Sequence, residues 1–131
     1  MNFYNVEVVC TTDDPVDTLE WHDMVAADKN AKTRMIPAWR PDAAMNIEAA
    51  TWKAYIEKLS KVSDTNIATF ADLIAALQKR HDFFASKGCK LSDHGIEEFY
   101  DEPYTNAEID AILGKALSGQ TPSVLEQRKF K

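Results

Sequence analysis

The stretch VEVVCTTDDP, residues 6–15, decides the fold class of this chain. Its first half is apolar and β-branched apart from Glu7, which is typical of a largely buried strand. The polar residues that follow end in Asp14 and Pro15, which are favoured at the N-cap and the first position of a helix. We therefore predict a strand over residues 6–10 that leads directly into a helix, which runs to about Asn30.

The same order of strand and helix recurs further along the chain. Residues 33–39 are predicted to form a second strand, although Pro37 within it removes a donor from the ladder. Asp42 is expected to cap a helix that continues through Leu59. Apolar residues at helical spacing then predict a helix over 67–84 that is ended by Gly88, and the short run 89–91 predicts a third strand.

The C-terminal part of the chain has two helix signals. Residues 105–108 form a capping box before a helix that is closed by Gly119, and Thr121 and Pro122 indicate the start of a last helix. Strands that are separated by helices usually lie parallel, because the crossover helix returns the chain to the same end of the sheet. A complete (β/α)₈ barrel takes about 250 residues. The sequence therefore predicts an α/β fold: a helix-rich, partial (β/α)₈ barrel with about three short parallel strands, in which residues 1–131 form a single region.

The composition argues against several classes of protein. The 131 residues carry a net charge of −6, and 45% of them are hydrophobic. An acidic chain without clustered basic residues is a poor partner for nucleic acid. No long apolar run and no export signal at the N-terminus point to a membrane, so we expect a cytoplasmic protein. Cys10 and Cys89 match no metal or redox spacing, and we expect both to be buried free thiols.

The exits of the three predicted strands carry the polar residues of interest. Because parallel strands end at one edge of a sheet, residues 11–14, 39–42 and 92–95 are expected to meet there. Ligands bind at this edge in α/β folds. The acids, the guanidinium and the imidazole of these exits are therefore the candidate site.

Several strings resemble, in order and in character, a run found in the uronate isomerases. These strings are residues 11–15, 19–22, 39–42, 88–89, 92–95 and 111–115, and the resemblance covers nearly all of the chain, as if it were the middle of that family's sequence. The resemblance implies a distorted (β/α)₈ barrel of the amidohydrolase superfamily. It also implies an aldose–ketose isomerisation that interconverts D-glucuronate with D-fructuronate, and D-galacturonate with D-tagaturonate.

The metal site implied by this resemblance has no counterpart here. Amidohydrolases carry a His-x-His pair on the first strand and an Asp on the last, whereas His22, His81 and His94 stand far apart in this chain. We expect this section to bind no metal and to be inactive alone. A divalent metal such as zinc is expected only in the complete enzyme, and the residues that act as catalytic base lie outside this section.

Arg40 is the strongest candidate for substrate binding. Its planar guanidinium beside Pro41 would suit a carboxylate or a hydroxyl pair, and Asp42 would steady it. A surface arginine next to an Asp42 that caps a helix is the alternative, and spacing alone leaves both open. The resemblance favours the substrate contact.

Two further residues are candidates for contacts to the sugar. Asp13 would accept hydrogen bonds from sugar hydroxyls. Alternatively, it is there only because acidic residues are favourable near the start of a helix, where they interact with the helix dipole. The neighbouring Asp14 is expected to be an N-cap with at most a supporting role. His94 would be oriented by Asp93, although a histidine in a turn is more often structural. We expect His22 to pack inside a helix.

Two other interpretations of the chain stay open. It would serve as a non-catalytic helical interaction module if the strand-like segments pack as loops, or as part of a metal-dependent hydrolase of the same superfamily. In each case a partial barrel leaves apolar faces uncovered. We therefore expect self-association of the isolated section.

Overall fold

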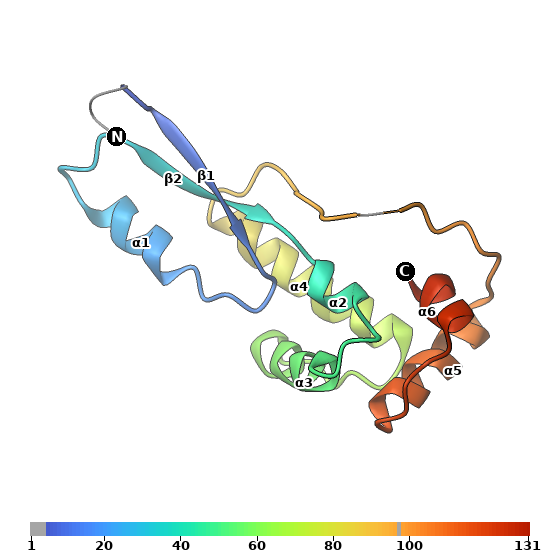
Figure 1. Cartoon of the computed structure of the whole chain (residues 1–131). Coiled ribbons are helices and arrows are strands. Elements are labelled where there is room, and N and C mark those ends of the chain that lie inside the picture. The colour runs from blue at the N-terminus through green and yellow to red at the C-terminus, as the bar shows by residue number, and fades with distance from the viewer. Residues whose placement is uncertain (1–4, 97) are drawn as a thin grey trace.

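The fold was taken from a computed structural model that describes residues 5–96 and 98–131. The elements follow in the order β1 (Val8–Asp13), α1 (Glu20–Ala27), β2 (Arg34–Trp39), α2 (Asp42–Met45), α3 (Trp52–Ser63), α4 (Phe70–Ser86), α5 (Asn106–Leu117) and α6 (Val124–Phe130). The molecule is elongated, with the sheet and α1 at one end, α5 and α6 at the other, and α4 running between them (Figure 1).

The two strands pair in parallel, as predicted. Their register places Val8 opposite Arg34 and Asp13 opposite Trp39, so β1 extends beyond Cys10, its predicted end, as far as Asp13. Pro37 is tolerated because of where its nitrogen points. The amides of Arg34 and Arg40 both donate to the β1 side, and alternation along a strand directs the nitrogen of Pro37 to the other edge.

The third predicted strand is wrong. Residues 89–91 form no strand, and the backbone pairing next to them is an isolated parallel bridge between Trp39 and Ser92. Two backbone hydrogen bonds make this contact, from Trp39 N to Leu91 O at 3.1 Å and from Asp93 N to Trp39 O at 2.9 Å. The segment leaves β2 after these bonds, so the described residues form a sheet of two strands. The α/β class is confirmed.

The first predicted helix begins later than its sequence signals indicate. Asp14 is not its N-cap, because α1 starts at Glu20 after Leu19, which adopts a left-handed φ of 59°. Asp14 instead closes a turn, in which its carboxylate accepts a hydrogen bond from Val16 N at 3.0 Å. A contact distant in sequence holds this turn, since the Tyr55 hydroxyl donates to the same carboxylate at 2.9 Å.

The helix predicted from Asp42 to Leu59 is divided in two. α2 ends at Met45 and α3 starts at Trp52, with turns between them. The indole nitrogen of Trp52 donates to the carbonyl of Ala44 at 2.9 Å, and the Trp52 side chain is only 2% exposed. Burial of this indole against α2 therefore requires the chain to turn back, which a continuous helix would prevent.

The remaining three helices were all predicted, but only α5 begins at its predicted capping box, at Thr105. Capping boxes that were not foreseen open α4 at Thr69 and α6 at Ser123, so α4 begins at Phe70 rather than at Ile67 and α6 begins after Pro122. Gly88 and Gly119 have left-handed φ angles of 91° and 88° and follow α4 and α5 as predicted. Only glycine adopts this conformation without steric cost.

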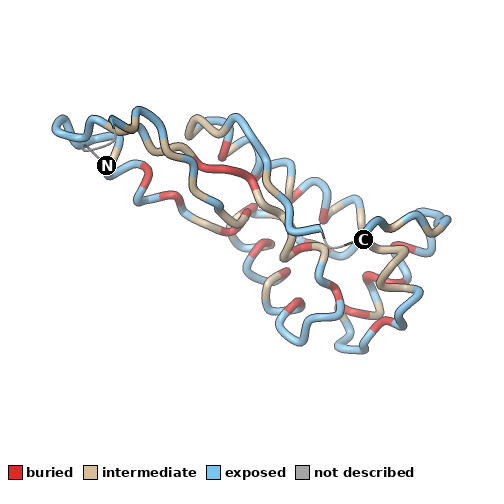
Figure 2. Tube along the Cα trace, turned by 45° about the horizontal axis from the view of Figure 1, so that its top comes forward, coloured by how far each residue is buried: buried red, intermediate tan, exposed pale blue. Residues whose placement is uncertain are grey.

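Most of the buried hydrophobic residues belong to two clusters. Figure 2 shows all the buried residues in red. The larger cluster lies between α3, α4 and α5 and includes Leu59, Ala76 and Leu113, all 0% exposed. The smaller one joins Leu19, Trp39 and Phe84 under the sheet. The rings of Trp39 and Phe84 meet edge to face at 5.1 Å.

Helices cover only one face of the sheet. Val8, Cys10 and Thr12 are exposed on the other face, so the prediction of a buried Cys10 thiol is wrong, while Cys89 is half-buried. The reason is that no element among the described residues packs over that face. No helix in the described part of the chain combines the length and the apolar character that crossing a bilayer requires.

Candidate active site at the strand exits

The three polar exits lie side by side, as predicted. Arg40 N donates to Asp13 O at 3.0 Å, which joins the exits of β1 and β2. The bridge at Trp39 brings residues 92–95 against the other side of β2. These backbone contacts form one rim at the carboxyl ends of the strands, which we call the exit rim.

Arg40 is held at the exit rim by two carboxylates. Its Nη2 donates to Asp93, and its Nε lies 3.9 Å from Asp42 Oδ2. The Thr12 hydroxyl also donates to Asp93 Oδ2, at 3.2 Å. The Arg40 side chain is 39% exposed, although its Nε is buried and has no hydrogen-bond partner in the described part of the chain. A guanidinium has five donors, so this arrangement fixes the plane of Arg40 and leaves donors for a ligand.

Asp42 fastens the third exit to the second. Its Oδ2 accepts a hydrogen bond from Gly95 N at 2.6 Å, and its Oδ1 lies 3.2 Å from His94 Nδ1. A Cβ atom on Gly95 would sit 3.2 Å from the same carboxylate, so the small residue permits this close approach. Pro41 takes the N-cap position of α2, and the predicted capping role of Asp42 is therefore wrong. His94 remains exposed, and its ring contacts Asp42 rather than Asp93, the partner that was predicted.

Asp13 reaches the exit rim with its backbone, but its carboxylate lies on the face covered by helices. Its Oδ2 accepts hydrogen bonds from the Thr11 hydroxyl at 2.6 Å and from Ala38 N at 3.3 Å. His22 Nε2 lies 2.7 Å from Thr11 Oγ1 and 3.7 Å from the Asp13 carboxylate. The Asp13 side chain is 12% exposed. Its predicted contact to substrate stays a prediction.

Sequence reasoning missed part of this arrangement. His22 is buried in α1, as predicted, but its hydrogen bond to Thr11 was not foreseen. Residues two apart in a strand share a face, so Thr11 and Asp13 could have been grouped from their spacing. The partner from α1 follows only from tertiary packing.

Asp14 supports the β1–α1 turn. Burial raises its pKa, while the hydrogen bonds from Val16 and Tyr55 act in the opposite direction. The pKa of the Tyr55 phenol is also raised, by burial and by the Asp14 charge. This pair joins the turn to α3, and its predicted supporting role for the site stays a prediction.

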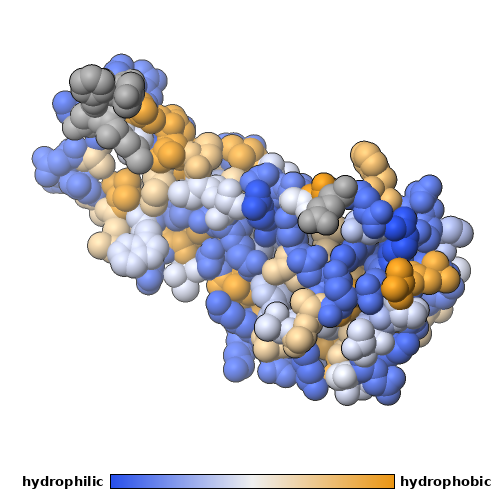
Figure 3. Space-filling model, in the orientation of Figure 1, coloured by the Kyte–Doolittle hydropathy of each residue, from blue (hydrophilic) through white to orange (hydrophobic). Residues whose placement is uncertain are grey.

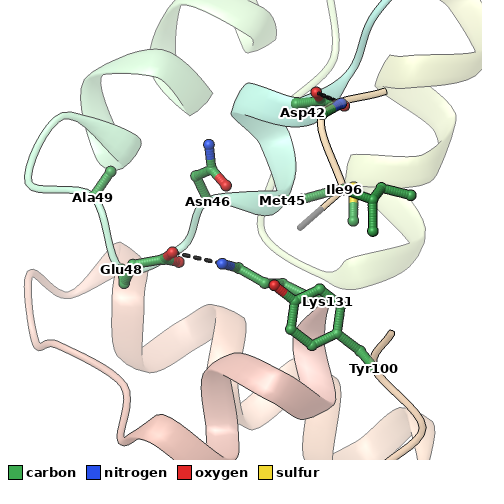
Figure 4. A pocket seen from close by; sticks show the side chains of 9 residues that line it. Asp42, Met45, Asn46, Glu48, Ala49, Ile96, Tyr100 and Lys131 are labelled. Atoms are coloured by element: carbon green, nitrogen blue, oxygen red, sulfur yellow. Dashed lines mark hydrogen bonds and ion pairs between the residues drawn. The ribbon is translucent and has the colours of Figure 1, made fainter. Parts of the chain in front are cut away.

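A hollow of about 360 Å³ extends from the exit rim toward the end of α6 (Figure 4). Asp42 and Ile96 stand at one end of it, and the Glu48–Lys131 ion pair, with Nζ and Oε1 2.5 Å apart, crosses the other. Tyr100 lines it from the segment before α5. Neither Tyr100 nor Lys131 carried any sequence signal for a site.

The metal implied by the resemblance finds no ligand set here. Within residues 5–96 and 98–131, no group of three or more His, Cys, Asp or Glu side chains is arranged to hold a metal ion. The side chains at the exit rim are Arg40, Asp42, Asp93 and His94, which offer a cation, two acceptors and an imidazole.

Comparisons with known proteins show the family and the fold of this chain. The sequence profile of the glucuronate isomerase family matches residues 1–131. Uronate isomerases of Phocaeicola vulgatus and Bacteroides thetaiotaomicron are each 56% identical over 132 residues, which is 100% of this chain and 28% of theirs. The chain thus spans about 28% of the length of these curated relatives.

Two solved structures also resemble this chain. The crystal structure of uronate isomerase from Thermotoga maritima matches with a TM-score of 0.92 and 34% identity, over 99% of this chain and 29% of that one. Glucuronate isomerase from Caulobacter crescentus matches in fold, with a TM-score of 0.82 at 21% identity, over 96% of this chain and 26% of that one. On the match of the family profile to its whole length, this chain belongs to the glucuronate isomerase family.

Proposed function

We propose that this chain is a section of a uronate isomerase and that its exit rim contributes to the substrate site. The reaction would interconvert D-glucuronate with D-fructuronate, and D-galacturonate with D-tagaturonate. Family membership supports the reaction. The observation that carries the role of this section is the half-exposed guanidinium of Arg40, oriented by Asp93 and Asp42 at the carboxyl ends of two parallel strands.

The proposed place of this section is a part of a (β/α)₈ barrel. In such barrels the helices form the outer layer and the carboxyl ends of the strands carry the site. Here α1 and α4 lie against one face of the sheet, while Val8, Cys10 and Thr12 are exposed on the other. The exposed face would be turned to the barrel interior. A divalent metal such as zinc would be held by parts of the complete enzyme outside this section.

The proposed roles follow from the demands of the reaction. Moving a proton between C1 and C2 of a sugar acid requires a base, an electrophile at the carbonyl oxygen and a cation for the distant carboxylate. Arg40 would supply the cation, because one of its donors engages Asp93 and others remain available. His94 would contact a sugar hydroxyl, with Asp42 setting the orientation of its ring. The base would come from outside this section.

A chimeric enzyme tests the role of Arg40. This chain would replace the matching section of the Phocaeicola vulgatus uronate isomerase, and ketose formation from D-glucuronate would be followed by proton NMR. A hydrogen bond to a charged group contributes about 1.5–3 kcal/mol, so Arg40→Lys should lower kcat/KM by about 10- to 150-fold. Arg34→Lys is the matched control, because Arg34 is exposed at the opposite end of β2.

Three results would contradict the proposal. If Arg40→Lys left kcat/KM unchanged, the planar guanidinium would have no role in binding. If this chain alone converted D-glucuronate, the section would not depend on the rest of a barrel. Hydrolysis of a lactone or an amide by the chimera, without isomerisation, would instead favour a hydrolase.

A further inference from the structure

Hydrogen bonds join Thr11, Asp13 and His22 into a group beside the sheet, which we call the β1 cluster. The Thr11 hydroxyl has one proton, which it donates to Asp13 Oδ2 at 2.6 Å; its other acceptor, Ile36 O, lies at 3.5 Å. The contact of 2.7 Å between Thr11 Oγ1 and His22 Nε2 therefore requires the proton on the histidine nitrogen. His22 is thus the donor in a short chain of hydrogen bonds that ends at Asp13.

Asp13 in turn accepts hydrogen bonds from the backbone of β2. The side-chain Oδ2 of Asp13 accepts from Ala38 N at 3.3 Å, and its backbone carbonyl oxygen accepts from Arg40 N at 3.0 Å. Asp13 therefore binds β2 on both sides of Trp39. Those two bonds set where the backbone of Arg40 leaves the strand.

The direction of the Arg40 side chain depends on that backbone. Its partner Asp93 is tied to the same place, because Asp93 N donates to Trp39 O at 2.9 Å. Both members of the Arg40–Asp93 pair are thus anchored at residues 38–40. His22 is 7% exposed, and its other ring nitrogen has no hydrogen-bond partner within residues 5–96 and 98–131. Among these residues, the bond to Thr11 is therefore the only hydrogen bond of the imidazole.

We propose that Thr11 and His22 are positioning residues, which hold the Asp13 carboxylate so that it fixes the backbone of Arg40 for substrate binding. The proposal rests on the proposed role of Arg40. It assigns the Asp13 carboxylate to the β2 backbone rather than to the sugar. Neither Thr11 nor His22 would touch the substrate.

The experiment uses the full-length chimera described above. Thr11→Val removes the hydroxyl while keeping the shape, and Thr11→Ser restores it. A contact made equally in the ground state and the transition state changes KM rather than kcat. We therefore expect Thr11→Val to raise KM for D-glucuronate by about tenfold with kcat within about twofold, and Thr11→Ser to restore KM. Thr51→Val is the control, because the exposed Thr51 makes no side-chain cap bond.

A double-mutant cycle with Arg40→Lys separates positioning from general destabilisation. Residues that act through one another show non-additive effects. Thr11→Val should therefore raise KM by less than about twofold when Arg40 is already lysine. Equal effects in both backgrounds, an unchanged KM in Thr11→Val, or a failed rescue by serine would overturn the proposal.

A second pair of variants keeps the test open if Thr11→Val does not fold. His22→Gln keeps a donor near the position of Nε2, while His22→Leu removes it. Leucine should raise KM and glutamine should not; equal KM values would overturn the proposal. Failure of the proposed function is distinguishable, because it appears as an Arg40→Lys enzyme with unchanged kcat/KM, whatever the β1 cluster does.

Discussion

Replacement of Arg80 by Met is expected to lower the stability of this section strongly. Arg80 lies on α4 and is 9% exposed. Its Nε donates to Pro15 O at 2.7 Å and its Nη2 to Asp17 O at 2.8 Å, so one side chain ties the β1–α1 turn to α4. Its guanidinium carbon also lies 4.2 Å from the centre of the Phe83 ring.

The magnitude follows from these contacts. Each hydrogen bond from a charged donor contributes about 1.5–3 kcal/mol, and the cation–π contact adds about 0.5–2 kcal/mol. Burial works in the opposite direction, since it lowers the pKa of Arg80, against the effect of Asp17, and thus disfavours the charged form. Methionine keeps the apolar stem, which recovers part of the packing. We expect the free energy of unfolding to fall by about 3 kcal/mol.

Urea unfolding of the isolated chain, followed by tryptophan fluorescence, measures this loss. The matched control is Lys79→Met, one residue earlier on α4. Lys79 also donates to two backbone carbonyls, at 3.2 and 2.9 Å, but from an exposed position. It should cost less than about 1 kcal/mol, because water replaces those bonds. An Arg80→Met chain within about 0.5 kcal/mol of the parent, or a Lys79→Met chain that loses as much, would refute the reasoning.

Two further predictions concern the loss of helix stability in acid and the self-association of the isolated chain. Hydrogen bonds from Lys115 and Ser123 hold the pKa of Glu126 at about 2, below its usual 4.5. The stabilisation that this gives α6 is complete above about pH 4.5 and is lost as the pH falls toward 2; helical circular dichroism should show this loss, and Glu126→Gln should remove it. The isolated chain should also self-associate, because Trp21 and Met24 are 65% and 61% exposed and apolar side chains reach the surface along β1 and beside α6 (Figure 3). Sedimentation velocity that shows one monomer at all concentrations would contradict this.

The sequence predicted the part of the candidate site that depends on the topology of the backbone. Strands that alternate with helices run parallel, so the exits at Asp13 and Arg40 had to share an edge. His94 joins this edge through the bridge between Trp39 and Ser92 and not through a third strand. The contacts of Arg40 with Asp93 and Asp42 lie within that edge. Which face each side chain takes was not foreseen. The sequence predicted that the first strand would end at Cys10, but β1 continues to Asp13. The Asp13 carboxylate therefore lies on the same face as Thr11 and beside His22.

Errors in the fold arose where distant contacts overrode local signals. Asp14 and Pro15 have the right residue types for a helix start, yet Tyr55 and Arg80 hold them in a turn. The apolar spacing from Ile47 to Leu59 is helical, but burial of Trp52 against Ala44 interrupts it. Local preferences are worth about 1 kcal/mol at a cap, whereas burying a large side chain contributes about 1.5–3 kcal/mol.

The sequence by itself determined the parallel strand pair, the presence of α4 and α6, the capped start of α5, and the edge at which the exits of β1 and β2 meet. The capped start depends on hydrogen bonds between neighbours in the chain, which local residue types control. The parallel pairing follows from the order of strand, helix and strand, which the hydrophobic pattern shows. Only the tertiary structure decided where α1 begins, where the helix after Asp42 breaks, and which face of the sheet receives Asp13. Those choices depend on which buried groups from distant segments find partners, and no local pattern contains that information.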